Sequence, residues 1–411
     1  MSAPPVIVLK FGGTSLATPA CRDAAAARVR ERVGEGARVV VVVSAMGRRG
    51  EPYATDTLLG LVDEFRACPP RERDAIAAVG EEISAAVFAA LLCERGLPAV
   101  SLRGFQAGIV TDGHHQEAAI REIRAARIRE HLECGAVVVV AGFQGITPEG
   151  ELTTLGRGGS DTSAVALGVA LAAERVEIYT DVDGVMTADP RLVPQAGRVG
   201  EVTFEESAEL AFKGAAVLHP RAAELARETG VTVEIRNTLS DAQGTWLVTG
   251  DAHAFTPEEG GGAISVTSSH GIAQVTVSGV DFAAQLAVLE RVFGTIAERG
   301  VTLDMMSIFP DRIAFTCESN SLPRVREALD GLGVAFAINE HCAKVTLVGA
   351  GIHGVPGVMH RMVRALTGAD VTIRQSVDSN MIIGVLVDAA READAVRAIH
   401  EEFFEARPAD H

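Results

Sequence analysis

Lysine is scarce in this chain of 411 residues. Of its 37 basic residues only Lys10, Lys213 and Lys344 are lysines, and the rest are arginines. A compact ammonium and a planar guanidinium are not interchangeable at a tight site, so a lysine that persists under this bias is a candidate for a chemical role. The 54 acidic residues outnumber the 37 basic ones. The resulting net charge of −17 argues against nucleic acid or an anionic membrane surface as the main partner.

Long apolar runs and paired cysteines are also missing. No stretch of the sequence approaches the length of a transmembrane helix, and the N-terminus enters an apolar run at once instead of beginning with a basic and then apolar signal. The six cysteines are scattered, without a Cys-x-x-Cys pair or a zinc-like His/Cys cluster. This pattern predicts free, mostly buried thiols in a reducing compartment. We therefore expect a cytoplasmic protein with no membrane partner.

What the sequence does contain is a series of short apolar runs that alternate with helical segments. The runs Val39–Val43, Val137–Ala141 and Val176–Tyr179 are continuous and rich in valine, which is typical of buried parallel strands. Between them a helix is expected over residues 80–95, with Val87 and Leu92 on its apolar face. Alternation of this kind predicts an α/β domain with a mostly parallel sheet. Ligands of such sheets bind beyond the carboxyl ends of the strands.

The segment Lys10–Ser15 follows the first of these strands, which is expected at Val6–Leu9. Gly12 and Gly13 allow a tight turn and a close approach of the backbone to a ligand. One lysine beside a glycine turn at a helix start suits an anionic ligand such as a phosphate. The alternative is an ordinary strand-to-helix turn with a solvated lysine. The turns Ser44–Gly47 and Gly142–Gly145 follow other predicted strands and would form further walls of the same site.

A second glycine turn, Arg157–Asp161, precedes an alanine-rich helical segment. The amides of the helix N-terminus, together with Arg157, suit a carboxylate or a phosphate. Asp161 suits a substrate ammonium or a metal-bound water. The alternative is a capped helix with an exposed arginine. Farther along, Thr180–Arg191 follows a predicted strand and fits a nucleotide-binding turn, whereas His219 before a proline is interpreted as a packed turn residue and not as a base.

After a glycine-rich linker over residues 249–262 the chain changes character. The segments 301–315 and 371–385 resemble each other, and each lies in a strand–helix–strand–strand–helix pattern. This predicts two tandem ferredoxin-like βαββαβ units, at 263–340 and 341–411, after an α/β domain at 1–248. The second unit has no closing strand of its own. A strand near 264–268 would complete it, so that the two units interlock.

Six features in order along nearly the whole chain resemble the aspartokinases. They are Lys10–Ser15, Gly80-Glu81, Arg157–Asp161, Thr180–Arg191, His219-Pro220-Arg221 and the C-terminal repeat. The loop Arg48–Leu59 and the segment Cys342–Gly351 are similar to the diaminopimelate-sensitive branch of Gram-positive bacteria. The resemblance implies an amino-acid-kinase fold followed by two ACT domains. It implies transfer of the γ-phosphoryl group of ATP to the side-chain carboxylate of L-aspartate.

The resemblance also implies roles for individual residues. Lys10 and Asp161 would be catalytic, with Mg²⁺ carried by ATP and not by protein ligands. The aspartate-binding residues would be Thr55, Glu81, Arg157, Gly158, Gly159 and Ser160. The ATP-binding residues would be Lys10, Gly12, Gly13, Ser44, Thr180, Asp181, Met186, Thr187, Ala188, Asp189, Pro190 and Arg191. An amino-acid effector would bind at Asp304 and Met306 of the ACT domains, through which the chain would form a homodimer or a higher homo-oligomer.

One departure from the family pattern bears on activity. The family has a lysine near the phosphates where this chain has Ala216. Loss of a charge from a dehydrated phosphate site costs several kcal/mol of transition-state stabilisation. We hypothesise that Lys213, three residues earlier, supplies that charge and is a third catalytic residue. Two alternatives stay open at this point: another enzyme of the amino-acid-kinase fold, and a relative with weak or lost activity that senses amino acids or serves a specialised pathway.

Overall fold

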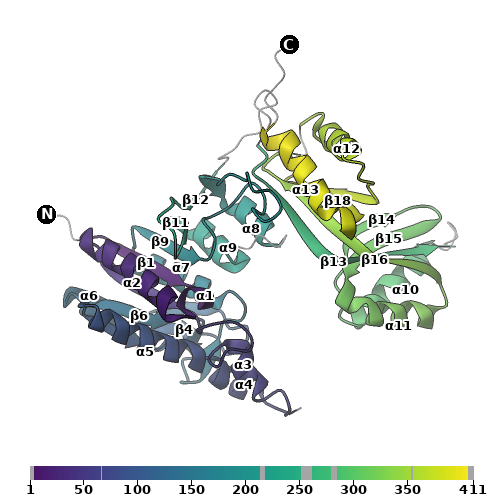
Figure 1. The fold of residues 1–411 in the computed structure, drawn as a ribbon. Coiled ribbons are helices and arrows are strands. Elements are labelled where there is room, and N and C mark those ends of the chain that lie inside the picture. Colours follow the sequence, from purple (N-terminus) through teal and green to yellow (C-terminus); the bar gives the residue numbers. More distant parts are fainter. Residues whose placement is uncertain are drawn as a thin grey trace. The chain divides into compact units, whose positions relative to one another are not determined.

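The computed structural model of the chain describes residues 4–65, 67–212, 218–250, 262–278, 285–352 and 355–405. These residues form two compact units (Figure 1). The N-terminal unit comprises residues 4–185, 198–212 and 218–250, and the C-terminal unit comprises 186–197 and 262–405. The segment Met186–Gly197, which the sequence places within the first domain, therefore packs with the C-terminal unit.

The N-terminal unit is built on an eight-stranded sheet that is mostly parallel. Its strands in spatial order are β10 (Glu201–Thr203), β12 (Thr245–Val248), β11 (Val233–Asn237), β9 (Arg175–Thr180), β1 (Val6–Phe11), β2 (Arg38–Val43), β6 (Val137–Ala141) and β3 (Ala99–Leu102). Only the β11–β12 pair in this sheet is antiparallel. The central strands are buried on both faces, as their valine-rich runs predict. The predicted α/β class is confirmed.

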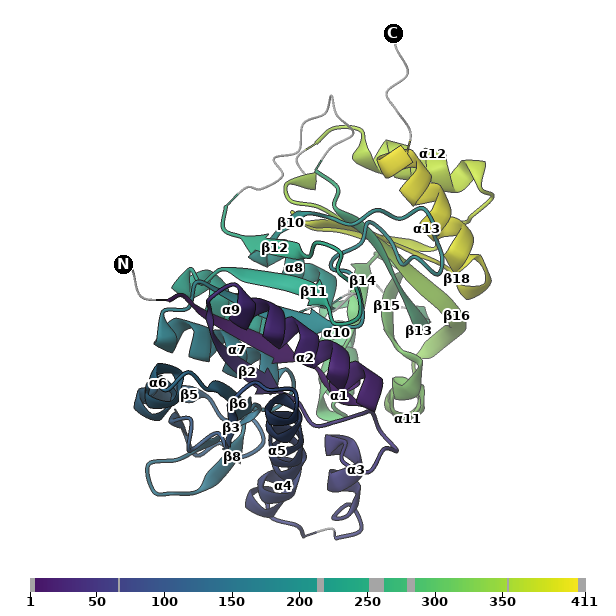
Figure 2. The same cartoon turned by 60° about the vertical axis from the view of Figure 1, so that its left-hand side comes forward.

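Helices cover both faces of this sheet (Figures 1 and 2). One face carries α2 (Pro19–Gly34) and α5 (Val79–Glu94), whose side chains Val29, Ala85 and Phe88 pack on Leu9 and Phe11 of β1. The other face carries α7 (Gly159–Leu171), which contacts β1 and β9 and packs on α9 (Pro220–Thr229). The remaining helices are α1 (Gly13–Leu16), α3 (Thr55–Gly60), α4 (Pro70–Ala77), α6 (Ala126–Glu133) and α8 (Phe204–Phe212).

A small second sheet lies beside the helices of this unit. Its strands are β5 (Ile120–Ile123), β4 (Ile109–Thr111), β7 (Gln144–Ile146) and β8 (Leu152–Thr154). The hairpin β7–β8 leads directly from β6 to the start of α7, with Ile146 paired to Leu152. It therefore positions the second glycine turn.

The helix expected at 80–95 begins earlier and turns a different face inward. Together α4 and α5 form a nearly continuous helical stretch, Pro70–Glu94, which by length and hydropathy alone is long enough to cross a membrane. This contradicts the expectation that no stretch approaches that length. Half of its most apolar window is buried, and Phe88 rather than Val87 enters the core, since Val87 is 39% exposed. The stretch is a core helix of this unit.

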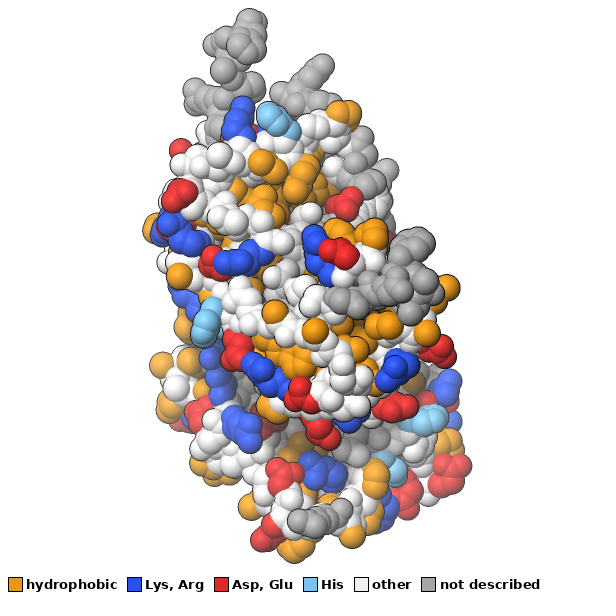
Figure 3. All heavy atoms as spheres, turned by 90° about the vertical axis from the view of Figure 1, so that its right-hand side faces the viewer, with side chains coloured by type: hydrophobic (Ala, Val, Ile, Leu, Met, Phe, Trp, Pro, Cys, Tyr) orange, Lys and Arg blue, Asp and Glu red, His pale blue; other side chains and the backbone are white. Residues whose placement is uncertain are grey.

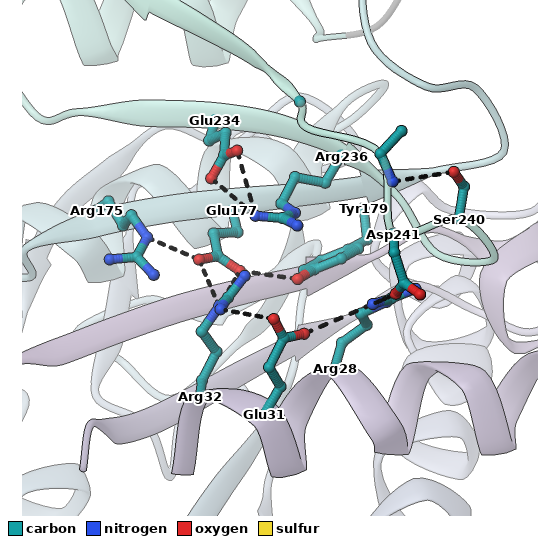
Figure 4. A network of polar contacts seen from close by, with 12 residues as sticks. Arg28, Glu31, Arg32, Arg175, Glu177, Tyr179, Glu234, Arg236, Ser240 and Asp241 are labelled. Atoms are coloured by element: carbon teal, nitrogen blue, oxygen red, sulfur yellow. Dashed lines mark hydrogen bonds and ion pairs between the residues drawn. The ribbon is translucent and has the colours of Figure 1, made fainter. Parts of the chain in front are cut away.

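A buried ionic network fixes α2 against the sheet (Figure 4). Glu177 of β9 accepts hydrogen bonds from Arg32 of α2 at 2.8 Å, from Arg175 at 2.7 Å and from the hydroxyl of Tyr179 at 2.9 Å. Tyr179 stacks on Phe11, with 4.8 Å between ring centroids. Burial of a charge is costly unless it is paired and hydrogen-bonded, and here each partner holds the other. The network makes the strands β1 and β9 a rigid support for the loops at their ends.

The C-terminal unit is a six-stranded sheet in the order β14 (Asp304–Ile308), β15 (Arg312–Glu318), β13 (Ser265–Ser278), β16 (Ala335–Val348), β18 (Ile382–Asp388) and β17 (Gln375–Asp378). All described pairs in it are antiparallel. The first half of β13 pairs with the second half of β16, with Ser265 opposite Val348, and so joins the second repeat. Four helices cover the sheet: α10 (Gln285–Glu298), α11 (Leu322–Leu332), α12 (Val358–Gly368) and α13 (Glu392–His400).

Surface charge is mixed where it can be followed in the space-filling view. Basic and acidic side chains are interspersed across the face in Figure 3, with apolar side chains in several small groups between them. All six cysteines lie within the described ranges and are free, and Cys317 and Cys342 are buried. The expectation that most of them are buried is wrong, since Cys21 and Cys68 are only partly buried and Cys93 and Cys134 are exposed.

Candidate active site

Loops that follow the parallel strands of the N-terminal unit enclose a cavity of about 1030 Å³. The ends of β1, β2 and β6 lie at one edge of the sheet, and each contributes a wall. Among the residues predicted from the sequence, those that line the cavity are Lys10, Gly13, Ser44, Thr55, Glu81, Arg157, Gly158, Gly159, Ser160 and Asp161. Residues from five distant parts of the chain therefore meet in one place.

The glycine turn after β1 is held by close backbone contacts. A Cβ atom on Gly13 would lie 2.6 Å from the carbonyl oxygen of Ala45, so only glycine fits beneath the Ser44–Gly47 loop. The amide of Gly47 donates to the carbonyl of Gly13 at 3.0 Å. On the buried side of the turn, the hydroxyl of Ser15 lies 2.7 Å from the hydroxyl of Thr238. The turn is thus fixed before any ligand arrives.

Lys10 faces the first turn of α7 across the cavity wall. Its ammonium lies 2.7 Å from a carboxylate oxygen of Asp161, and both side chains are largely buried. The helix begins at Gly159, earlier than expected, so that Ser160 and Asp161 belong to its first turn. Gly158 precedes it with φ of 68°, and a Cβ atom there would overlap the ring of His219. A glycine is required at this position for both reasons.

Glu81 is a buried acid at the bottom of the cavity. One of its oxygens accepts a hydrogen bond from the amide of Ala45 at 3.0 Å. The other has no hydrogen-bond partner among the described residues. Burial raises the pKa of Glu81 to about 8, although the backbone hydrogen bonds act in the opposite direction. A carboxyl group held in this way is suited to receive a cationic group of a ligand.

Asp74, which the sequence did not single out, is fully buried and also lines the cavity. Its carboxylate accepts hydrogen bonds from His115 Nδ1 at 2.6 Å, from the amide of Gln116 at 3.0 Å and from the hydroxyl of Thr154. These bonds hold Gln116 in a left-handed conformation, with φ of 71°. Its carbonyl oxygen would be 2.8 Å from a Cβ atom on Gly156, next to Arg157. Asp74 therefore fixes the loop against which Arg157 is positioned.

A sequence signal for Asp74 exists. Asp74 and Glu81 are seven residues apart in one helical stretch, and this spacing places two side chains on the same face.

His219 and Arg221 take a larger part in the site than the sequence indicated, because both line the cavity. His219 caps α9, and burial lowers the pKa of its imidazole. Arg221 donates to the carbonyl of Leu155 at 2.6 Å and so braces the turn before Arg157.

The predicted nucleotide-binding residues fall into two groups, one in each unit. Gly12 lies beside β9, with its amide 3.4 Å from the carbonyl of Tyr179, and Thr180 and Asp181 follow at the end of that strand. By contrast, the segment from Met186 to Arg191 packs in the C-terminal unit, where Ala188 joins the core around Val266 and Val345. The role of that segment in binding ATP stays a prediction. Lys213 and Ala216 lie outside the described residues.

The two residues predicted to bind an effector lie on β14 of the C-terminal unit. The carboxylate of Asp304 pairs with the ammonium of Lys344, which is buried in β16. Met306 is more than half exposed. Their binding role stays a prediction.

Comparisons with known proteins agree with this architecture. Residues 5–237 match the amino acid kinase family, and residues 345–403 match an ACT domain. The chain is 43% identical over 403 residues to aspartokinase 1 of Bacillus subtilis, covering 97% of this chain and 98% of that protein. It is 39% identical over 410 residues to an aspartokinase of Geobacillus stearothermophilus, covering 97% of each.

Among solved structures, the chain resembles E. coli aspartokinase III in complex with lysine and aspartate. The TM-score is 0.78 at 25% identity, over 97% of this chain and 99% of the other. It shares its fold with aspartate kinase of Clostridium acetobutylicum, with a TM-score of 0.79 at 21% identity over 97% and 100% of the two chains. The predicted resemblance is confirmed: the chain belongs to the aspartokinases, kinases in which an amino acid kinase domain is followed by an ACT domain.

Proposed function

We propose that this protein transfers the γ-phosphoryl group of ATP to the side-chain carboxylate of L-aspartate. One observation carries the proposal: Glu81, an acid with an unpartnered oxygen among the described residues, lines the same cavity as Arg157 and the N-terminus of α7. An acid on one side and an arginine with helix amides on the other match the ammonium and carboxylate groups of an amino acid. Lys10 and the glycine turn lie beside this acceptor site.

In this proposal the acceptor is oriented by charge. Glu81, together with Thr55, receives the ammonium group of aspartate, while Arg157 and the Gly158–Ser160 turn hold a carboxylate. Asp161 contributes to the ammonium site or to the magnesium shell of MgATP. Asp74 and Arg221 act as positioning residues, since they hold the loops on both sides of Arg157.

The chemistry requires no strong general base, because a carboxylate is already ionised at neutral pH. Catalysis then depends on alignment and on neutralising the charge that spreads over the transferred phosphoryl group. Lys10 is placed for this task at the cavity wall, where its ammonium is shared with Asp161 until a phosphate competes for it. We propose that Lys213 adds a further charge, and Lys213→Ala with unchanged turnover would exclude that role.

We further propose the biological setting implied by the family. The reaction is the first step toward lysine or diaminopimelate, threonine and methionine in the cytoplasm. An amino acid bound at the ACT domains, residues 263–340 and 341–411, regulates it through Asp304 and Met306. The chain assembles as a homodimer through these domains.

An ATP- and aspartate-dependent hydroxamate assay tests the proposal. Hydroxylamine traps the acyl phosphate of whichever acceptor is phosphorylated, so a trapped product is expected with aspartate but not with glutamate or carbamate as acceptor. The assay is repeated with lysine, threonine and diaminopimelate, at least one of which should lower the rate. Absence of hydroxamate under every condition would overturn the proposal and favour an amino-acid sensor without kinase activity.

A further inference from the structure

Arg48 lies beside the glycine turn but is not among the residues predicted to bind ATP or aspartate. It follows Gly47, whose amide is bonded to the carbonyl of Gly13, and its side chain lines the same cavity as Lys10 and Gly13. Glu51 holds the backbone of Arg48 in a turn: its carboxylate accepts from the Arg48 amide, and its own amide donates to the Arg48 carbonyl at 2.9 Å. The root of the Arg48 side chain is therefore fixed against the turn after β1.

The far end of the Arg48 side chain reaches the neighbouring strand. Its guanidinium donates to Asp181 at 3.0 Å, and Asp181 directly follows β9. Because β9 is paired with β1 and Gly12 is bonded to Tyr179, the side chain spans the mouth of the glycine turn from one flank to the other. A ligand phosphate placed on that turn would meet the guanidinium.

The ion pair of Arg48 with Asp181 is weak enough to be exchanged. The Arg48 side chain is 73% exposed and that of Asp181 51%, and exposed pairs of this kind contribute little to stability. Lys10 differs, because its partner Asp161 is largely buried with it. Lys10 offers a single positive charge, which it shares with Asp161, so the several negative charges of a polyphosphate at this turn are better balanced by a further cation. A guanidinium is well suited, because it binds two phosphate oxygens at once.

We infer that Arg48 is a phosphate-binding residue that leaves Asp181 and binds the terminal phosphates of the nucleotide. This inference rests on the proposed ATP site. It adds a specificity element: Arg48 recognises the phosphate chain and does not contribute to recognition of the nucleoside.

Titration calorimetry on Arg48→Ala, with wild type as reference, tests this inference. The ligands are a non-hydrolysable ATP analogue, ADP and adenosine. Loss of a charge-assisted hydrogen bond predicts about tenfold to hundredfold weaker binding of the ATP analogue and ADP, with adenosine unchanged. Arg48→Lys keeps the positive charge but not the guanidinium that can bind two oxygens at once, and it should recover part of the lost affinity. Arg124→Ala is the matched control, because Arg124 forms an exposed pair with Glu122 at 2.9 Å, and neither residue lines the cavity.

Two results would overturn the inference. Equal binding of the ATP analogue by wild type and Arg48→Ala would remove Arg48 from the site. An equal loss for adenosine and the ATP analogue would assign Arg48 to loop structure instead, a role that thermal unfolding of the free variant would also report. Failure of the proposed function is a separate outcome, since it would appear as absence of aspartyl hydroxamate in the wild type.

Discussion

Two lysine–aspartate pairs, one in each unit, show how context gives the same residues different capacities. Lys10 and Asp161 face each other at the carboxyl edge of the parallel sheet, beside a cavity of about 1030 Å³. Lys344 lies within the antiparallel sheet of the C-terminal unit, only 3% exposed, and reaches Asp304 on an edge strand. A ligand has room to compete for the first lysine, whereas the second lies on β16, which is flanked on its two sides by β13 and β18.

The difference follows from the two kinds of sheet. Parallel strands return through helices, so that several loops open at one edge and leave a site between them. In an antiparallel sheet, side chains on one strand lie directly opposite side chains on the next strand, which leaves little room beside them. A retained lysine is therefore evidence of chemistry only where the topology also provides space. The following substitutions test this comparison, from the largest expected effect to the smallest.

Lys10→Ala should cause the largest loss. Removing the ammonium beside the glycine turn is expected to lower kcat by about 10³-fold, because charge on the transferred phosphoryl group is no longer balanced. The hydroxamate assay measures the loss of kcat. Lys10→Arg serves as control, because it keeps the positive charge but changes the shape of the charged group. If Lys10→Ala stays within tenfold of wild type, the contrast between the two lysines is lost.

Glu81→Gln should raise KM for aspartate by about 100-fold and leave KM for ATP unchanged, since a neutral amide cannot pair with the ammonium. The raised pKa of about 8 means that the empty folded site keeps its proton above pH 4.5, whereas the unfolded chain loses it. Stability from this group therefore falls as pH rises from about 4.5 to 8.

The same variant should gain stability while it loses activity. Glu81→Gln removes the cost of burying an ionisable acid and is expected to raise the free energy of unfolding at pH 8 by about 1–2 kcal/mol. Chemical denaturation at pH 5 and pH 8 measures the change, and Glu82→Gln on the same helix serves as control. A destabilised Glu81→Gln would show that the acid is structural.

Asp74→Asn should have an intermediate effect. The amide accepts at one oxygen only, so at least one of its donors in the His115–Gln116 loop loses its bond, and Arg157 loses part of its support. We expect about a tenfold rise in KM for aspartate, with KM for ATP unchanged, and a loss of about 1–3 kcal/mol in stability. Thr154→Val, which removes one donor only, should give a smaller rise. Equal changes in both KM values would contradict a positioning role.

Lys344→Met should have the smallest effect. It replaces a buried charge by an apolar chain of similar length, and the carboxylate that it leaves behind, Asp304, is about half exposed and therefore stays hydrated. Basal activity is expected within twofold of wild type and stability within about 1 kcal/mol, measured by the hydroxamate assay and thermal unfolding. A loss of activity comparable to that of Lys10→Ala would break the comparison.

Much of the N-terminal unit was predictable because its signals are local. Valine runs such as Val39–Val43 specify strands buried on both faces, and the glycines of Lys10–Ser15 specify a turn. The face of α5 was not predictable from hydrophobicity alone. Both Val87 and Phe88 are apolar, and only packing against Phe11, 5.7 Å between ring centroids, selected Phe88.

The sequence by itself determined the parallel sheet, its glycine turns and the family, since these depend on residue types at short spacing. The tertiary structure decided which side chains meet. Asp74 joins His115 and Thr154 from separate elements, and Met186–Gly197 packs with the C-terminal unit although it is flanked by strands of the other. Such contacts depend on burial and on hydrogen bonds between segments far apart in the chain, and no local pattern encodes them.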